Sequence, residues 1–335
     1  MGIKMKQIVV CIACTPEQKQ NIAETAGNDN CVIFLQDIED EKARSEVCRR
    51  AHIVIGEPSI ADIRANKNLE WVQMTWAGTD KYTIKQEDDS SGFPKDVLLT
   101  HMSGAFGVIM SEYAIGAILA MYRKFPTYWK QQQNGIWLDA GAEESLYGKT
   151  ALLLGTGDIG SNLAVRLKAF GAKIIGVRRN TANVPSGFDE MYGFERLDEL
   201  LPLADIVACS LPNKPLTRGL ITKERLLSMK KNAILLNMGR GTLLDLEDLC
   251  EVLAAGHLGG VILDVTAPEP LPMEHALWKY DRVMLTPHIA GPSIGHCPAT
   301  QEKIVNICCE NLKRYFTDEP LLHIISDEDF EYDRL

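Results

Sequence analysis

The sequence predicts an α/β fold with two doubly wound parallel-sheet domains. Apolar, β-branched runs of strand length alternate with polar segments of helix length through the first hundred residues, and the alternation resumes from Thr150. This order is typical of parallel sheets that carry helices on both faces. A length of 335 residues with 46% hydrophobic content also exceeds the usual size of one domain.

Strands are expected at the apolar runs of both series. The first series gives residues 7–13, 31–35, 51–56, 70–74 and 97–100, and the second gives 150–154, 173–177, 206–210, 233–237, 260–265 and 283–286. A long apolar segment, 108–122, indicates a buried helix, and residues 299–316 indicate a final one. The polar stretch 130–145 is long for a connection, so we expect it to pack on something, such as a partner subunit.

Composition excludes several classes of protein. The net charge of −10 argues against a general attraction to nucleic acid or to an anionic membrane. No window approaches the roughly 18 apolar residues of a membrane span, and the first residues lead into a strand without the apolar stretch of a signal peptide. The nine cysteines are scattered. We therefore expect a cytoplasmic protein with free thiols. Cys11 and Cys14 have redox-motif spacing but lie in or beside the first strand, so no metal site is expected.

A glycine turn follows the first strand of the second series. Gly155, Gly157 and Gly160 form a GxGxxG pattern between an apolar strand and the start of a helix, and Asp158 and Ile159 stand inside it. Gly155 permits the tight turn, Gly157 lets the backbone approach a pyrophosphate, and Gly160 allows close packing of helix and strand. The helix N-terminus offers free amides to the phosphates. The context predicts a dinucleotide-binding turn rather than an ordinary glycine-rich one.

The residues after the next strand bear on the choice of cofactor. NAD-type sites usually place Asp or Glu about 20 residues after the first glycine, where the carboxylate accepts hydrogen bonds from the ribose. This chain has Arg178 and Arg179 there. A guanidinium can instead pair with a 2′-phosphate, which favours NADP(H) over NAD(H). The alternative is that both arginines are solvated and the site accepts either cofactor.

Three later strands each end in residues that could carry chemistry. Arg240 follows the strand at 233–237, Glu269 lies in the proline-rich loop after 260–265, and His288 follows the last strand. Ligands bind at the carboxyl ends of strands in open α/β sheets. Each residue alone has a structural explanation, but together they supply the groups that reduce a 2-keto acid.

These motifs, in this order, resemble the D-isomer-specific 2-hydroxyacid dehydrogenase family over nearly the whole chain, and most of all its glyoxylate/hydroxypyruvate reductase branch. The resemblance also includes residues 76–80, residues 103–107 with Glu112, and Leu211-Pro212 with Thr217. It implies that Arg240 grips the substrate carboxylate or polarises its ketone. It implies further that His288 is the proton donor and that Glu269 orients the imidazole.

The resemblance implies further contacts and a discontinuous layout. Backbone amides near Ala77 and Gly78 would bind the substrate carboxylate. The cofactor-binding residues would be Gly155, Gly157, Asp158, Ile159, Gly160, Arg178, Arg179, Leu211, Pro212, Thr217, Met238, Gly239, Asp264 and Gly291. The substrate domain would take residues 1–103 and 296–335, with an NAD(P)-binding Rossmann domain, 104–295, inserted into it. Family members commonly dimerise, which makes a homodimer the expectation.

Two alternatives remain open from the sequence. The chain could be a 3-phosphoglycerate dehydrogenase-like enzyme, although the length leaves no room for the regulatory domain that such enzymes often carry. It could also be a nicotinamide-sensing corepressor of the same fold, for which a peptide-binding cleft or a long disordered flank would speak. The partner expected for the enzyme is a small 2-keto or 2-hydroxy acid.

Overall fold

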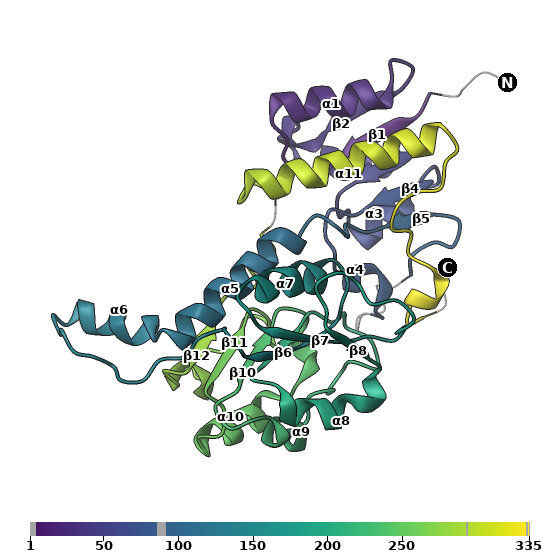
Figure 1. Cartoon of the computed structure of the whole chain (residues 1–335). Coiled ribbons are helices and arrows are strands. Elements are labelled where there is room, and N and C mark those ends of the chain that lie inside the picture. Colours follow the sequence, from purple (N-terminus) through teal and green to yellow (C-terminus); the bar gives the residue numbers. More distant parts are fainter. Residues whose placement is uncertain (1–4, 86–91, 293, 333, 335) are drawn as a thin grey trace. The chain divides into compact units, whose positions relative to one another are not determined.

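The computed structural model describes residues 5–85, 92–292, 294–332 and 334. The chain divides into two compact units (Figure 1). Unit 1 comprises Met1–Ala105 and Pro292–Leu335, and unit 2 comprises Phe106–Gly291. Unit 1 is therefore built from both ends of the chain, with unit 2 inserted between them.

Unit 1 contains a five-stranded parallel sheet with the order β2-β1-β3-β4-β5. The strands are β1 (Gln7–Val10), β2 (Cys31–Phe34), β3 (Ile53–Ile55), β4 (Trp71–Gln73) and β5 (Leu98–Thr100). Strands β1, β3 and β4 are almost wholly buried, as is usual where helices cover a parallel sheet. Thr100 also forms an antiparallel bridge with Ile324, so the C-terminal segment is attached to the edge of the sheet.

The helices of unit 1 are α1 (Pro16–Ala26), α2 (Glu41–Cys48), α3 (Ile60–Ala65), α4 (Asp80–Thr83) and α11 (Pro298–Phe316). Three of them, α1, α2 and α3, begin at side-chain caps. Thr15 caps α1 through a reciprocal capping box with Gln18, and Pro16 occupies a first-turn position that needs no amide hydrogen. Helices α1 and α11 pack side by side although they come from opposite ends of the chain (Figure 1).

Unit 2 contains a seven-stranded parallel sheet with the order β12-β11-β10-β9-β6-β7-β8. The strands are β6 (Thr150–Leu154), β7 (Lys173–Val177), β8 (Glu190–Tyr192), β9 (Ile206–Cys209), β10 (Ile234–Asn237), β11 (Gly260–Leu263) and β12 (Val283–Leu285). The order reverses direction at β6, so the loops after β6 and β9 open the crevice in which such sheets bind ligands.

Helices cover both faces of the second sheet. They are α5 (Gly107–Tyr122), α6 (Phe125–Gln133), α7 (Asp158–Ala169), α8 (Leu197–Leu200), α9 (Lys223–Ser228) and α10 (Leu246–Ala254). Helices α5 and α7 pack together on one face, with α8, α9 and α10 on the other, while α6 projects away from the rest of unit 2 (Figure 1).

The predicted α/β fold with two parallel sheets is confirmed, with local differences. Strand β8 was not predicted, because its sequence, Glu-Met-Tyr, has no apolar run and it lies at the sheet edge. Several strands are shorter than the apolar runs, since residues such as Cys11 continue into the loop after the strand ends. The polar stretch from residue 130 includes the end of α6, which the sequence analysis left without a helix.

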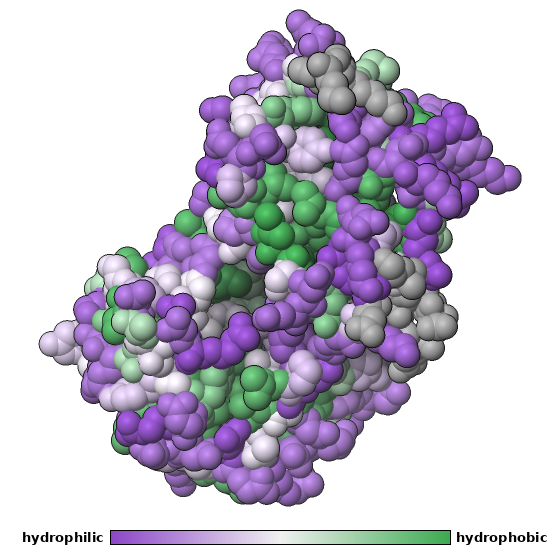
Figure 2. Space-filling model, turned by 90° about the vertical axis from the view of Figure 1, so that its right-hand side faces the viewer, coloured by the Kyte–Doolittle hydropathy of each residue, from purple (hydrophilic) through white to green (hydrophobic). Residues whose placement is uncertain are grey.

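Most of the face drawn in Figure 2 is covered by hydrophilic side chains, with apolar residues gathered in smaller patches. Among the described residues, no helix combines the length and apolar character that a membrane crossing requires. All nine cysteines are free thiols, and Cys308 and Cys309 are buried in unit 1.

Candidate active site

In the glycine turn between β6 and α7, an added side chain would find open space at Gly157 but not at Gly155 or Gly160. Gly155 has φ +97°, and a Cβ on Gly160 would lie 2.0 Å from the Gly155 carbonyl oxygen. These two glycines are therefore required by the backbone itself. A Cβ on Gly157 would have no heavy atom within 4 Å, so the N-terminus of α7 faces empty space.

Polar groups without partners among the described residues lie next to Gly157 along the chain. Gly157 is the N-cap of α7 and provides no side-chain hydrogen bond. Within the described part of the chain, the amides of Asp158, Ile159 and Gly160 have no hydrogen-bond acceptor, as expected for the first turn of a helix. The buried Oγ1 of Thr156 also has no partner. Free amides, a positive helix end and an orphaned hydroxyl fit a bound pyrophosphate.

The side chain of Asp158 serves the neighbouring helix. Its Oδ2 accepts from the amide of Gly107 at 2.7 Å, and its Oδ1 accepts from Asn162 at 3.1 Å. Gly107 is the first residue of α5, which has no other side-chain cap. A contact between Asp158 and the cofactor is thus restricted to the backbone, and the carboxylate joins α7 to the N-terminus of α5.

The two arginines predicted to recognise a 2′-phosphate stand directly after β7. The amide of Arg178 donates to the Tyr192 carbonyl at 3.0 Å, so β8 fixes the backbone there. Arg178 is half-buried and Arg179 is exposed. Neither forms an ion pair with any described residue. The carboxylate of Glu190, on β8, is opposite Ile175 and binds Lys173 instead, toward the start of β7.

The loop after β9 is closed by a threonine. The Thr217 hydroxyl donates toward the carbonyls of Pro212 and Lys214 at 2.5 and 3.0 Å and accepts from the Lys214 amide at 3.0 Å. A Cβ on Gly239 would lie 2.6 Å from the Leu211 carbonyl. Leu211, Pro212 and Thr217 therefore form one tight turn that packs against Gly239.

Arg240 follows β10 in a turn that the side chain of Asn237 holds. Asn237 donates to the Arg240 carbonyl at 2.9 Å and accepts from the Gly239 amide at 3.1 Å. Met238 is buried within this turn, while Arg240 is partly exposed and donates to the Gly239 carbonyl at 2.7 Å. Asn237 was not predicted to have a role; the signal for it is a polar residue that ends an otherwise apolar strand.

Glu269 and His288 lie together, as a proton-transfer pair requires. The His288 Nδ1 is 3.0 Å from Glu269 Oε2, and Glu269 Oε1 accepts from the Thr266 amide at 2.9 Å. The carboxylate is thereby oriented by one contact and orients the imidazole with the other. Because Nδ1 faces Glu269, Nε2 is the outward nitrogen, and the His288 side chain is 51% exposed.

Asp264 holds the backbone that carries His288. Its carboxylate accepts from the Thr286 hydroxyl at 2.7 Å and from the amides of Ile289 and Ala290 at 2.8 and 2.9 Å, and its carbonyl accepts from the His288 amide at 2.8 Å. His288 has φ +54°, a left-handed conformation that needs such support. The predicted contact of Asp264 with the cofactor stays a prediction; in the structure its carboxylate holds the histidine loop, and its amide donates to the Asn237 carbonyl at 3.0 Å.

Gly291 follows this loop and packs against α5. A Cβ there would lie 3.2 Å from the Met110 sulfur and 3.4 Å from Phe106. The loop therefore has little room for a larger residue. The Tyr113 hydroxyl, also on α5, is 2.6 Å from the Thr286 hydroxyl, so the same helix supports the loop at two points.

In unit 1, Ala77 and Gly78 lie in the loop between β4 and α4. The Trp76 carbonyl accepts from the Met102 amide at 3.0 Å, and the Ala77 carbonyl lies 3.3 Å from His101 Nδ1. Across the described residues, no acceptor is found for the amides of Ala77 and Gly78. Two adjacent free amides fit a carboxylate.

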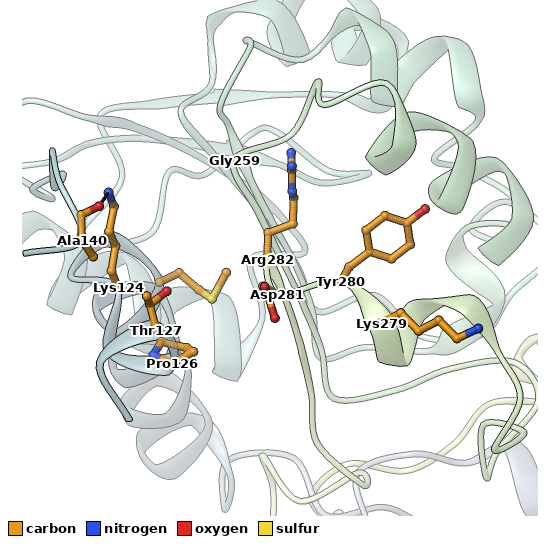
Figure 3. Close-up of a pocket in the computed structure, with 10 residues that line it drawn as sticks. Lys124, Pro126, Thr127, Ala140, Gly259, Lys279, Tyr280, Asp281 and Arg282 are labelled. Carbon is orange, nitrogen blue, oxygen red and sulfur yellow. Dashed lines mark hydrogen bonds between the residues drawn. The ribbon is translucent and has the colours of Figure 1, made fainter. Parts of the chain in front are cut away.

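A cavity of about 420 Å³ lies elsewhere in unit 2 (Figure 3). It is lined from the α5–α6 junction and from Gly259 and Arg282, which precede β11 and β12. It is therefore at the amino ends of these strands, opposite the loops that carry Arg240 and His288. Lys124 donates a hydrogen bond to the Ala140 carbonyl at 2.6 Å, so its ammonium group already has a partner in the protein. In the described part of the chain, no cluster of three or more His, Cys, Asp or Glu could hold a metal ion.

The chain is similar to known proteins throughout its length. Residues 115–290 match the family described as D-isomer specific 2-hydroxyacid dehydrogenase, NAD binding domain. A glyoxylate reductase of Thermofilum pendens is 36% identical over 257 residues, which cover 74% of this chain and 72% of that protein.

Solved structures agree. A D-isomer specific 2-hydroxyacid dehydrogenase family protein of Aeromonas salmonicida is 29% identical with a TM-score of 0.84, covering 96% of this chain and 99% of that one. A D-isomer specific 2-hydroxyacid dehydrogenase of Xanthobacter autotrophicus, in complex with NADPH and MES, is 25% identical with a TM-score of 0.77, covering 96% and 98%. The chain belongs to the D-isomer specific 2-hydroxyacid dehydrogenase family, and it is an oxidoreductase that acts on CH–OH donors with NAD(P).

Proposed function

We propose that this enzyme reduces a small 2-keto acid of the glyoxylate or hydroxypyruvate type to the D-2-hydroxy acid, with NADPH preferred over NADH. The observation that carries the proposal is the Glu269–His288 pair, with its Nδ1–Oε2 distance of 3.0 Å and an outward Nε2. The similarity to a glyoxylate reductase supports the choice of substrate class.

Four residues of unit 2 have separate roles in the proposed reaction. A bound nicotinamide supplies the hydride that reduces the carbonyl carbon. His288 gives the proton on Nε2 to the carbonyl oxygen, while Glu269 holds the ring in place. Arg240 binds the substrate carboxylate or polarises its ketone through its planar set of donors. Asp264 keeps the histidine loop in its left-handed turn.

The preference for NADPH rests on charge. The phosphates would lie against the free amides of Asp158, Ile159 and Gly160. Arg178 and Arg179 would pair with the 2′-phosphate, since no described carboxylate neutralises them. The likeness to a structure that contains NADPH supports this choice. Met238, Gly239, Gly291 and the Leu211–Thr217 turn would form the walls of the cofactor site.

Unit 1 would act as the substrate domain and unit 2 as the cofactor domain. The free amides of Ala77 and Gly78 would bind the substrate carboxylate in unit 1. The free thiols agree with a cytoplasmic enzyme.

A homodimer would form through the projecting α6 segment. Five large apolar side chains are exposed on or just after α6: Phe125 (45%), Trp129 (58%), Ile136 (50%), Trp137 (103%) and Leu138 (65%). Such a patch on a projecting segment is typical of an interface. Sedimentation should show a dimer that the double change Trp137→Glu and Leu138→Glu converts to a monomer; an unaltered sedimentation coefficient would contradict this interface.

The test of the proposed function is a panel of 2-keto acids assayed with each cofactor. Glyoxylate and hydroxypyruvate should be reduced with NADPH at a higher kcat/KM than with NADH. Phosphohydroxypyruvate should be a poor substrate if the enzyme is not of the 3-phosphoglycerate dehydrogenase type. Lack of turnover with every acid would overturn the proposal, and efficient turnover of phosphohydroxypyruvate alone would replace it with the phosphoglycerate alternative.

A further inference from the structure

The loop that offers the free amides of Ala77 and Gly78 is attached to a carboxylate that the proposed reaction does not use. Glu57 stands just after β3, at the carboxyl edge of the unit 1 sheet. Its Oε1 accepts from the Thr75 amide at 2.5 Å and from the Trp76 amide at 3.2 Å. The Thr75 hydroxyl lies 3.0 Å from each carboxylate oxygen. Glu57 thus binds the two amides that directly precede those of Ala77 and Gly78.

The backbone of Glu57 and of its neighbour is fastened to the same segment from the other direction. Lys81 donates from Nζ to the Glu57 carbonyl at 2.8 Å, and the buried Tyr82 hydroxyl donates to the Pro58 carbonyl at 2.8 Å. Both donors follow the loop and belong to α4. The loop from Thr75 to α4 is therefore tied at both ends to Glu57 and Pro58.

A second side chain holds the loop at its centre. His101 Nδ1 lies 3.3 Å from the Ala77 carbonyl, so the nitrogen that faces this oxygen must carry a hydrogen to donate. The His101 amide donates to the His323 carbonyl at 3.1 Å, and the two imidazole rings meet edge to face at 5.6 Å. His101 is thereby placed by the C-terminal segment, and it occupies the Ala77 carbonyl while leaving the Ala77 amide free.

Burial makes the Glu57 contacts specific. Desolvation raises the pKa of Glu57, while hydrogen bonds from Thr75 and the charge of Lys81 act in the opposite direction. A buried carboxylate that accepts several hydrogen bonds fixes the positions of its donors, because an unpaired polar group in a low-dielectric interior is costly. Glu57 accepts from two consecutive amides, and the next two find no acceptor among the described residues, as a two-point carboxylate site requires.

We propose that Glu57 and His101 are positioning residues that present the amides of Ala77 and Gly78 to the substrate carboxylate. The inference rests on the proposed function, because it takes that carboxylate as the ligand of these amides. Glu57 acts through Thr75 and Trp76, and His101 acts through the Ala77 carbonyl. Neither residue takes part in hydride or proton transfer. The loss of either should therefore weaken substrate binding without lowering kcat, the rate at which the bound substrate reacts.

The first test is Glu57→Gln, with Glu70→Gln as the matched control. Both glutamates are in unit 1 and accept hydrogen bonds, but Glu70 binds Lys6 and Tyr315 and has no contact with the loop. A glutamine at 57 keeps the shape, but it replaces the carboxylate that binds the Thr75 and Trp76 amides with a neutral amide, which is a weaker acceptor. The KM for glyoxylate should rise about tenfold, as expected for one lost hydrogen bond, with kcat and the KM for NADPH within twofold. Glu70→Gln should change none of the three.

Two further readouts keep the failures distinguishable. Thr75→Val removes only the hydroxyl contact, so it should raise the KM for glyoxylate less than Glu57→Gln and serves if the latter fails to fold. Amide exchange of residues 75–78, measured on the NADPH-bound enzyme without substrate, should be faster in Glu57→Gln. An unchanged KM for glyoxylate in both variants, in a wild type that turns over, would overturn the inference and leave the proposed function standing. Absence of turnover in the wild type would defeat the proposed function itself, and faster exchange would then show only that Glu57 orders the loop.

Discussion

The two units are both parallel α/β sheets, yet the groups proposed to act in them are of different kinds. Unit 2 offers side chains: Arg240, Glu269 and His288 each follow a strand end. Unit 1 offers backbone amides, at Ala77 and Gly78, held by side chains that lie behind them. Functional side chains can be predicted from a sequence because their identities are written in it. Free backbone amides cannot, because they depend on which hydrogen bonds the folded loop leaves unmade.

The largest effect should come from the side-chain half of this comparison. His288→Ala removes the proposed proton donor, so kcat should fall about 10²- to 10⁴-fold with NADPH affinity largely kept. His257→Gln is the control, because His257 Nε2 lies 2.8 Å from the Met229 carbonyl, before β11 and away from the carboxyl ends of the strands. Steady-state assays and NADPH titration measure both. A wild-type rate in His288→Ala would remove this residue as the acid.

Two glycines of the turn after β6 should respond differently to substitution by alanine. Gly160→Ala puts a Cβ 2.0 Å from the Gly155 carbonyl, so it should lower the free energy of unfolding by about 1–3 kcal/mol or more. Gly157→Ala meets open space and should fold with a change below about 1 kcal/mol, but weaken NADPH binding roughly tenfold. Urea unfolding and NADPH titration measure the two quantities. Equal loss of stability in both variants would contradict the open space at Gly157.

Reversal of one charge tests the cofactor preference. Arg178→Asp should raise the KM for NADPH about 10- to 100-fold, because a charge-assisted pair is lost, and should affect NADH far less. Lys231→Asp makes the same change of charge in the loop before β10, at the amino edge of the sheet, and should leave the preference alone. Equal NADPH affinity in Arg178→Asp and wild type would refute the assignment of the 2′-phosphate.

The smallest effect concerns the acid stability of unit 1. Burial, and then the nearby His323, lowers the pKa of His101 below its ordinary value of about 6.5. The unfolded chain therefore binds the proton more readily below that pH, and acid favours unfolding. Wild-type stability should fall more steeply than that of His101→Gln as pH drops from about 6.5. Parallel curves of unfolding midpoint against pH would contradict this.

Particular residues show what the sequence could and could not predict. Strand–helix alternation and the glycine turn predicted both sheets, since apolar runs and the backbone needs of Gly155 and Gly160 are local properties. The Glu269–His288 contact joins loops 19 residues apart, and family resemblance rather than spacing predicted their roles. The support given by Asn237 and Glu57 was not predicted, because it depends on which backbone groups the folded turns leave unpaired. Strand β8 was missed because pairing with β7 forms it without an apolar pattern.

The most direct test of the central claim follows the hydride itself. The enzyme is incubated with hydroxypyruvate and NADPH that carries deuterium at both positions of nicotinamide C4, and the product is examined by mass spectrometry and chiral separation. The product should be D-glycerate with one deuterium on C2, and His288→Ala should not form it. Glycerate without deuterium at C2, the L-isomer, or no reduction of hydroxypyruvate or glyoxylate would contradict it.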